Sequence, residues 1–412
     1  MAHPFPRAAR IGAGVALVAL AFGACSLGGS GAGVPPTATP NPCATHATTT
    51  AIAWAEAGDK QIHGSLGGGA PGVLSNFTYP LGVPDETFEA ATVLPGFLTF
   101  SPDGHHIAVD MRVYVPFARD NNIYIVDTAT HAVTHVTALA LGPDPQGQEA
   151  RQLAWADNHT VIAMPGPRGP GGSAAAYSYD ITTNTATALP GVTNAIEGVV
   201  RCGTLFYSDL SAGSTLSDPN HTTVFHERIH RYDLASHAEV GSPLTISDAF
   251  TYGGAEGEIS YAGWDVSRDG TRIVWQQGVV SSSTMDITST FHSANADGSG
   301  AGLILTGPPA ATAHAYARMA ISADGTKVAV TGAAPTPSVI TGPVTGGGGI
   351  RYYTPDQIEQ PAWLPDNSGF LAGGDGFTPG IEQYLLATPL NAAGQAPGTT
   401  AHANGYYPAT LP

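Results

Sequence analysis

The pattern that governs the architecture of this chain begins with Ser101-Pro102-Asp103-Gly104 and continues into His106-Ile107-Ala108-Val109. Serine and aspartate side chains cap the backbone N–H groups of a turn, and glycine supplies the positive φ that a reversal needs. The residues after the turn are typical of a short buried strand. We therefore expect this corner to join two antiparallel strands in a hairpin.

Similar corners recur along the chain at intervals of roughly 40–55 residues, with one longer gap. The clear copies are Ser267-Arg268-Asp269-Gly270 and Ser322-Ala323-Asp324-Gly325. Weaker copies are Ala55-Glu56-Ala57-Gly58, Ala156-Asp157-Asn158, Arg201-Cys202-Gly203 and Pro365-Asp366-Asn367. Strand units at this spacing predict the blades of a propeller, because one sheet cannot bury both of its faces but stacked sheets can.

A second feature repeats in phase with the corners. Alternating strands end in an aspartate at Asp127, Asp180 and Asp233, and a Thr- or Ala-rich segment such as residues 128–134 follows. We expect each of these aspartates to begin the next turn.

The Ser-Pro-Asp-Gly corner and the strand Ile123-Tyr124-Ile125-Val126-Asp127 resemble the repeats of TolB-like, WD-type β-propellers. The resemblance covers roughly residues 48–400 and implies an all-β fold, a single β-propeller of four-stranded antiparallel blades. The seven corners favour seven blades, with six or eight as alternatives. We place the propeller at residues 48–408.

Composition excludes several classes of protein. Of 412 residues, 42% are hydrophobic and only 11% charged, so long surface helices rich in Glu, Lys and Arg are not expected. The formal charge of −17 argues against a nucleic-acid partner and against docking on anionic lipid through a basic face.

The N-terminal residues predict export. Arg7 and Arg10 precede an apolar run that ends in Phe22-Gly23-Ala24-Cys25, so residues 1–24 are interpreted as a signal peptide. The small residues before Cys25 resemble a bacterial lipobox, which implies lipidation of Cys25 and an extracytoplasmic protein held at the cell membrane by its N-terminal lipid. The alternative is an ordinary cleaved signal peptide. Residues 25–47 predict a flexible Gly/Pro/Thr linker.

The remaining cysteines, Cys43 and Cys202, are candidates for a disulfide, since exported chains meet an oxidising compartment. Two buried free thiols are the alternative.

No catalytic, cofactor or metal site emerges from the sequence. His226-Glu227-Arg228-Ile229-His230 spells the H-E-x-x-H zincin motif, but it runs into a strand, where residues four apart lie too far from each other to share one zinc ion. No G-x-S-x-G nucleophile elbow occurs. The 15 histidines are interpreted as exposed turn and strand residues, and we expect them to take up protons between about pH 7 and 5.

Two functions remain. The first is a membrane-tethered, monomeric binding module for a protein, a peptide or an envelope polymer, with loops 165–172, 211–223 and 336–349 as its binding rim. The second is a propeller enzyme, a hydrolase or lyase acting on glycans through carboxylates in the central funnel. Low charge density favours binding over catalysis.

Overall fold

The computed structural model describes sixteen segments, and the statements below concern these alone. They are residues 51–56, 58–79, 93–113, 123–139, 153–164, 175–211, 224–250, 263–280, 287–306, 319–332, 338–347, 350–353, 358–374, 381–385, 399–402 and 405–411. The predicted signal peptide, Cys25, the linker and Cys43 lie outside them. The chain divides into two compact units, residues 1–40 and 41–412, and the ring described here belongs to the second unit.

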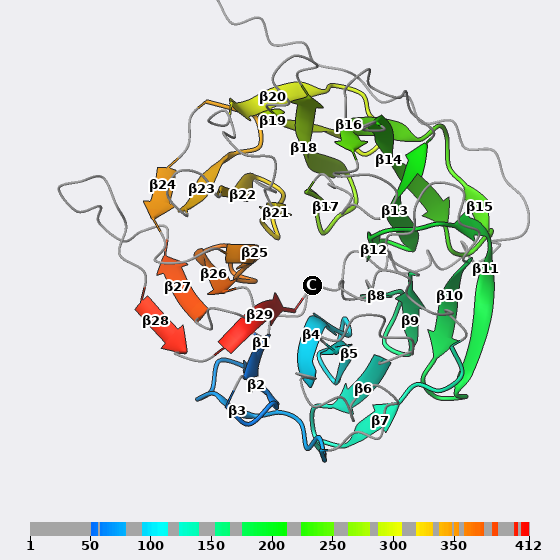
Figure 1. Ribbon diagram of the computed structural model, residues 1–412, viewed down its shortest axis with the longest axis vertical. Coiled ribbons are helices and arrows are strands. Elements are labelled where there is room, and N and C mark those ends of the chain that lie inside the picture. Colours follow the sequence, from blue (N-terminus) through cyan, green and yellow to red (C-terminus); the bar gives the residue numbers. More distant parts are fainter. Residues whose placement is uncertain are drawn as a thin grey trace, which may run out of the picture. The chain divides into compact units, whose positions relative to one another are not determined.

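The described residues form strands and turns without any helix, and six hydrogen-bonded sheets result. One sheet has eight strands, but a single parallel bridge, Gly374 to Tyr406, joins its two four-stranded antiparallel halves. The strands thus form seven blades around one axis (Figure 1), which confirms the all-β propeller. None of the described residues lies in a helix suited to crossing a membrane.

The strands of each blade are given from the axis outward. Blade 1 contains β29 (Gly405–Thr410), β1 (Ala51–Glu56), β2 (Ile62–Leu66) and β3 (Gly72–Val73); blade 2 contains β4 (Val93–Phe100), β5 (His106–Val113), β6 (Ile123–Asp127) and β7 (Val133–His135); blade 3 contains β8 (Leu153–Trp155), β9 (Thr160–Ala163), β10 (Ala175–Asp180) and β11 (Thr185–Thr193).

Blade 4 contains β12 (Gly198–Arg201), β13 (Thr204–Ser211), β14 (Val224–Asp233) and β15 (Ala238–Glu239), with β16 (Leu244–Phe250) as an extra partner of β14; blade 5 contains β17 (Trp264–Val266), β18 (Arg272–Val280), β19 (Ile287–Asn295) and β20 (Gly302–Thr306). Blade 6 contains β21 (Met319–Ile321), β22 (Lys327–Gly332), β23 (Ser338–Pro343) and β24 (Ile350–Tyr353); blade 7 contains β25 (Ile358–Trp363), β26 (Gly369–Gly374), β27 (Ile381–Leu385) and β28 (Thr399–His402).

The corner around Gly58, the first in the sequence, lies at a different position in its blade from the other corners because of the way the ring closes. The innermost strand of blade 1 is β29, which comes from the end of the chain and pairs antiparallel with β1. The turn around Gly58 therefore joins β1 to β2, the second and third strands of its blade, and not the first to the second. It lies at the opposite end of the blade from the other corners, because each antiparallel strand reverses direction.

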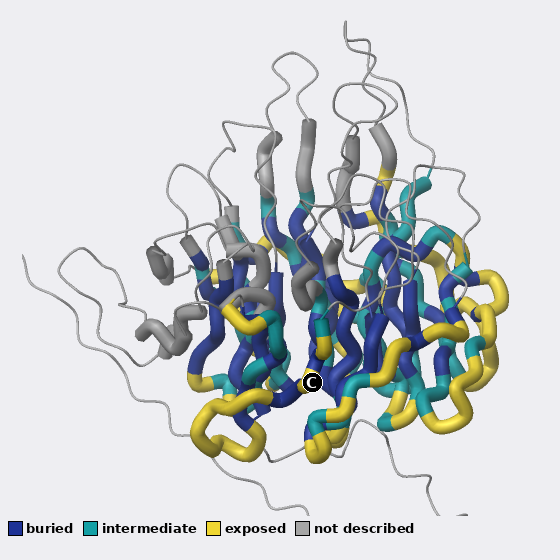
Figure 2. Tube along the Cα trace, turned by 60° about the horizontal axis from the view of Figure 1, so that its bottom comes forward, coloured by how far each residue is buried: buried dark blue, intermediate teal, exposed yellow. Residues whose placement is uncertain are grey.

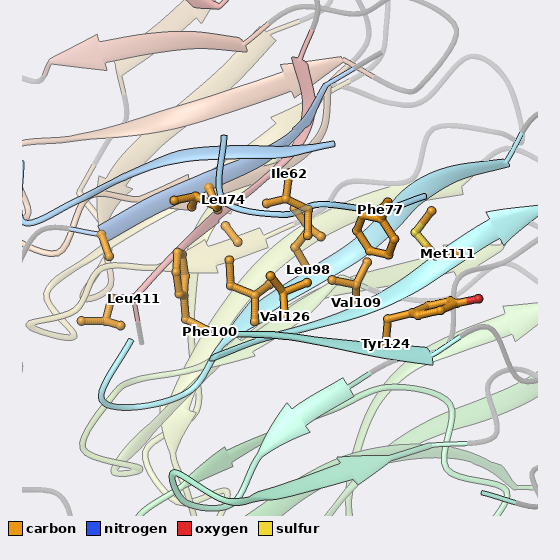
Figure 3. Packing of buried hydrophobic residues seen from close by; sticks show 14 residues of the cluster. Ile62, Leu74, Phe77, Leu98, Phe100, Val109, Met111, Tyr124, Val126 and Leu411 are labelled. Atoms are coloured by element: carbon orange, nitrogen blue, oxygen red, sulfur yellow. The ribbon is translucent and has the colours of Figure 1, made fainter. Parts of the chain in front are cut away.

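The core is distributed between the blades. Seven clusters of buried apolar residues lie between consecutive blades, from the cluster that joins blades 1 and 2 to the cluster that joins blades 7 and 1. The first of them contains Phe100, Val126 and Leu411 (Figure 3), although Leu411 is far from the other two in sequence. Each sheet thus buries both faces, as the repeat predicted.

Candidate functional site

One end of the ring is built from short turns, and we call it the corner face. In its clearest turn, Ser101 Oγ donates to Asp103 Oδ1 (2.6 Å) and accepts the N–H of His106 (2.9 Å), while Gly104 has a φ of 74°. The Ser267/Asp269/Gly270 and Ser322/Asp324/Gly325 corners repeat this geometry. These carboxylates are occupied by their own turns, which leaves them little to offer a ligand.

The remaining predicted turn aspartates also accept hydrogen bonds from backbone N–H groups of their own turns. Asp157 and Asp366 accept N–H groups of residues that follow them in their corners, as do Asp127, Asp180 and Asp233 in the turns between third and fourth strands. Because alternate turns of an antiparallel blade lie at the same end, both sets belong to the corner face. Exposed turns line this face along the lower edge of Figure 2.

The axial end of the corner face is occupied by the end of β29 (Figure 1) and by an arginine. Leu411 is 2% exposed, and its N–H donates to the carbonyl oxygen of Ala51 (3.0 Å). Its own carbonyl oxygen accepts a hydrogen bond from Arg268 Nη2 of the blade 5 corner (3.1 Å). The contact ties blade 5 to blade 1, which is not its neighbour in the ring.

A partly buried pair of charged side chains, Arg201 and Asp265, links blades 4, 5 and 6 beside this point. Arg201 Nε donates to the carbonyl of Val266 (3.2 Å), and Arg201 Nη2 lies 3.8 Å from Asp265 Oδ1. Asp265 Oδ2 accepts the N–H of Ile321 (2.9 Å) in the next blade. Burial raises the pKa of Asp265, although Arg201 and two backbone N–H groups oppose the shift. Asp265 is therefore held in structural contacts.

The opposite end of the ring is called the loop face. Among the described residues, the ladders between second and third strands are longest in blades 4 and 5, and they extend toward this face. The β13–β14 ladder extends from Thr204–Asp233 to Ser211–His226, and the β18–β19 ladder from Arg272–Asn295 to Val280–Ile287. By contrast, the β9–β10 ladder of blade 3 spans only Thr160–Asp180 to Ala163–Tyr177. Blades 4 and 5 therefore project further on the loop face than blade 3.

A connected set of polar side chains covers one face of blade 4, and we call it the blade-4 network. It consists of Tyr207, Asp209, Arg228, His230 and Glu239. Arg228 binds Asp209 through two hydrogen bonds, from Nε (2.9 Å) and from Nη2 (2.5 Å). His230 Nε2 lies 3.0 Å from Asp209 Oδ1, and its ring stacks on Tyr207 with centroids 4.7 Å apart. The Tyr207 hydroxyl donates to Glu239 (2.5 Å).

Electrostatics stabilise the charged form of the acid at the centre of this network. Burial alone would raise the pKa of Asp209, but His230 and Arg228 outweigh it and lower the pKa. Burial and the Glu239 carboxylate raise the pKa of Tyr207, so its hydroxyl stays a donor. The arginine is 30% exposed and Glu239 40%, so both can contact a ligand.

Two residues of the zincin-like motif, Arg228 and His230, belong to the blade-4 network, and the motif does not form a zinc-binding helix. The motif lies in β14, where alternate residues point to opposite faces, so His226, Arg228 and His230 share one face and Glu227 lies on the other, fully buried. Within the described segments, no three His, Cys, Asp or Glu side chains form a group that could hold a metal ion.

The structure corrects the interpretation of the histidines as uniformly exposed. His105, His135, His159 and His237 are exposed, but three others are only partly exposed and stack on aromatic rings, namely His63 on Trp54, His230 on Tyr207 and His292 on Trp275. Burial lowers the pKa of His106 and of His292, so these two take up protons at a lower pH than an exposed histidine does. The pairing register between neighbouring strands places these rings together, and this register cannot be read from the sequence of one strand alone.

Most of the predicted binding rim falls outside the described residues, including 165–172 and 212–223. Of the third loop, residues 338–343 form β23, so part of that stretch is a strand. Cys202 lies at the turn between β12 and β13 and is not a free thiol. Its predicted partner Cys43 is outside the described residues, so the pairing stays a prediction.

No family model and no curated protein matches this chain. Several solved structures are similar to it. A hydrazine synthase chain of Kuenenia stuttgartiensis is 14% identical with a TM-score of 0.45, over 71% of this chain and 76% of that one. A chain of a mitotic checkpoint complex is 12% identical with a TM-score of 0.46, over 82% of this chain and 89% of that one. A prolyl endopeptidase is 12% identical with a TM-score of 0.49, over 85% of this chain and 50% of that one. Likenesses this remote do not indicate an activity.

Proposed function

We propose that this chain is a lipid-tethered, extracytoplasmic β-propeller that binds a protein, a peptide or an envelope polymer through the loop face of blades 4 and 5. The blade-4 network is the observation that carries the proposal. A chain with so few charged residues places an arginine, two carboxylates, a histidine and a tyrosine on one face of a single blade. Such a set offers fixed donors and acceptors to a polar ligand.

The difference between the corner face and the loop face also supports a binding site on the loop face. The turn aspartates of the corner face are saturated by their own backbone N–H groups, and its axial end is occupied by Leu411 and Arg268. The loop face instead carries the longer ladders and the partly exposed Arg228. Binding propellers commonly use loops that a rigid ring holds in place.

A glycan hydrolase or lyase is the second candidate, and it would need a pair of carboxylates that share a substrate. Asp265 lies beside the axis, but Arg201 and the N–H of Ile321 hold it. No specific observation among the described residues favours this alternative, and binding remains the proposal.

The test compares two variants of the full chain. Arg228→Gln removes the guanidinium of the blade-4 network, and Arg231→Gln changes an arginine of the same strand on the other sheet face. Each purified protein is incubated with isolated cell-wall polymer and, separately, with cross-linked detergent-solubilised envelope. We expect Arg228→Gln to reduce retention about tenfold or more, as for loss of one charged hydrogen-bonding partner. Equal retention by both variants would contradict the placement of the site.

A further inference from the structure

Two arginine side chains lie beside each other near the axial end of the corner face. Arg201 belongs to the corner of blade 4 and Arg268 to the corner of blade 5. These corners touch, because a Cβ placed on Gly270 would lie 3.4 Å from the Cβ of Arg201. Burial lowers the pKa of Arg268 and the positive charge of Arg201 lowers it further, so the two guanidinium groups are close enough to repel each other.

This arginine pair is only partly balanced by negative charge. The carboxylate that faces it is that of Asp265, whose Oδ1 lies 3.8 Å from Arg201 Nη2. Within the described segments, no carboxylate forms an ion pair with Arg268, whose Nη2 donates to the backbone carbonyl of Leu411 (3.1 Å). With Asp265 ionised, the three side chains carry one net positive charge, opposite in sign to the formal charge of the whole chain, −17.

The guanidinium of Arg268 is held in place without being saturated. A guanidinium has five N–H groups, and Arg268 uses one of them for Leu411. Leu411 is 2% exposed and donates its own N–H to Ala51 (3.0 Å), so the contact fixes the orientation of the arginine. Arg201 is 21% exposed, and Arg268 is also only partly buried. The other N–H groups of Arg268 are thus positioned in advance for a ligand.

We propose that Arg268, with Arg201 beside it, binds a single carboxylate group of a small ligand at the axial end of the corner face. A guanidinium donates two parallel hydrogen bonds to a carboxylate, and the one negative charge of that group matches the net charge of the three side chains. A phosphate monoester carries nearly two negative charges, and a polymer of phosphodiesters is a polyanion that the charge of the chain repels. The site is separate from the blade-4 network and does not rest on it.

A purely structural role of Arg268 predicts a different outcome. If this side chain only ties blade 5 to Leu411, its replacement changes the stability of the ring and leaves the affinity for a carboxylate unchanged. If it binds the carboxylate, the affinity changes in a direction set by the charge that is removed. Loss of Arg268 then weakens binding, and loss of the Asp265 charge strengthens it.

The first experiment measures binding by the full chain. Ligand-observed saturation-transfer NMR compares propionate with its uncharged analogue propionamide, at an ionic strength held constant with sodium chloride. We expect propionate to bind saturably and at least about tenfold more tightly than propionamide. Inorganic phosphate, added as a competitor, should displace propionate only at concentrations above the dissociation constant of propionate. Equal binding of the two probes, or displacement by less phosphate, would overturn the proposal.

The second experiment locates the site with three variants. Arg268→Gln should raise the dissociation constant of propionate about tenfold, as for loss of one charged hydrogen-bonding partner. Asp265→Asn should lower it, because the amide oxygen can still accept the N–H of Ile321 while the repelling charge is gone. Arg272→Gln is the matched control and should leave it unchanged.

Arg272 suits this purpose because it belongs to the same blade. It begins β18 and lies on the sheet face opposite to Ile273, which packs toward blade 4. A dissociation constant that rises equally in Arg272→Gln and Arg268→Gln would overturn the assignment, and so would one that does not fall in Asp265→Asn.

Arg268→Lys replaces the glutamine variant if that protein does not fold. Lysine keeps the positive charge but not the planar fork that donates two parallel hydrogen bonds, so the dissociation constant of propionate should still rise. An unchanged constant would contradict the binding role of Arg268. These measurements involve no residue of the loop face, so their outcome is independent of the Arg228→Gln test.

Discussion

The corners of blades 3 and 7 contain an asparagine, Asn158 and Asn367. Asn367 has a φ of 59°, a left-handed conformation that asparagine tolerates better than most residues. Its side-chain oxygen accepts the N–H of Asp324 in the neighbouring corner (3.2 Å), and Asn158 does the same for Asp103 (3.1 Å). Both of these corners, which look degenerate in sequence, therefore gain a hydrogen bond to the neighbouring blade.

Asn367 provides a graded test of these two roles. Asn367→Gly keeps the left-handed backbone and loses the hydrogen bond, so we expect a loss of about 0.5–1 kcal/mol in the free energy of unfolding. Asn367→Ala also strains the backbone and should lose about 1 kcal/mol more. Urea unfolding of the full chain measures both. Equal stability of the two variants would show that the backbone conformation contributes nothing.

The corner aspartates make stability depend on pH. Burial tends to raise the pKa of Asp324, but hydrogen bonds from Ser322 and Thr326 lower it overall, and Asp269 behaves alike. A lowered folded-state pKa stabilises the fold at pH values above the unfolded-state pKa, near 3.9, and this stabilisation disappears as the pH falls through the folded-state pKa.

We therefore expect Asp324→Asn to lower the melting temperature at pH 7 and to make its decline below about pH 4 less steep than in the wild type. Scanning calorimetry between pH 7 and 3 measures the effect. Parallel curves for variant and wild type would show that this carboxylate contributes no pH-dependent stability.

Among elements, the innermost strands are joined by tryptophan side chains. Trp363 Nε1 donates to the carbonyl of Ala320 in blade 6 (2.8 Å), and Trp155 Nε1 donates to that of Thr99 in blade 2 (3.0 Å). These are the same blade pairs that the asparagine contacts connect. The sequence shows an aromatic residue before several corners, but its hydrogen-bonding partner lies one repeat away and depends on how the blades stack.

Trp363→Phe tests the indole hydrogen bond. We expect a loss of about 1–3 kcal/mol in the free energy of unfolding, because the change leaves the buried Ala320 carbonyl without its donor and removes ring volume. Trp264→Phe is the matched control, since Trp264 is similarly buried (7% against 5%) and its Nε1 has no hydrogen-bond partner among the described residues. A control variant as destabilised as Trp363→Phe would assign the loss to packing alone.

Aromatic–histidine pairs recur at one place in three blades. Trp54, Tyr207 and Trp275 each occupy the fourth position of the second strand and face a histidine directly across the ladder. Sequence periodicity located these strands but gave no register, so the histidines looked like exposed residues. The blade-4 network escaped prediction for the same reason, since its members come from β13, β14 and β15.

At the scale of the whole molecule, the spacing of corners was enough to predict the ring and its blades. Two features were not accessible to it. The extra strand β16 and the long hairpins of blades 4 and 5 interrupt the repeat, and the β13–β14 hairpin of blade 4 carries four of the five residues of the blade-4 network. The closure of blade 1 by β29 joins segments from opposite ends of the chain, which a local pattern does not report.

Removing residues 403–412 tests the closure. The truncated chain lacks β29 and Leu411, so blade 1 loses its innermost strand and the cluster shared with blade 2 loses two of its members, Ala409 and Leu411. We expect a lower urea midpoint and a broader, less cooperative transition. An unchanged midpoint and slope would contradict the view that the pairing of β29 with β1 stabilises the ring.

The pairing of β1 with β29 also means that the ring cannot close until β29 has been synthesised. The ribosome produces the first strand of blade 1 early and its axial partner among the last residues, so no growing chain can complete the circle. Until β29 has been made, β1 keeps an unpaired edge that other chains could join. An incomplete chain is therefore more prone to associate with other chains than the closed ring is.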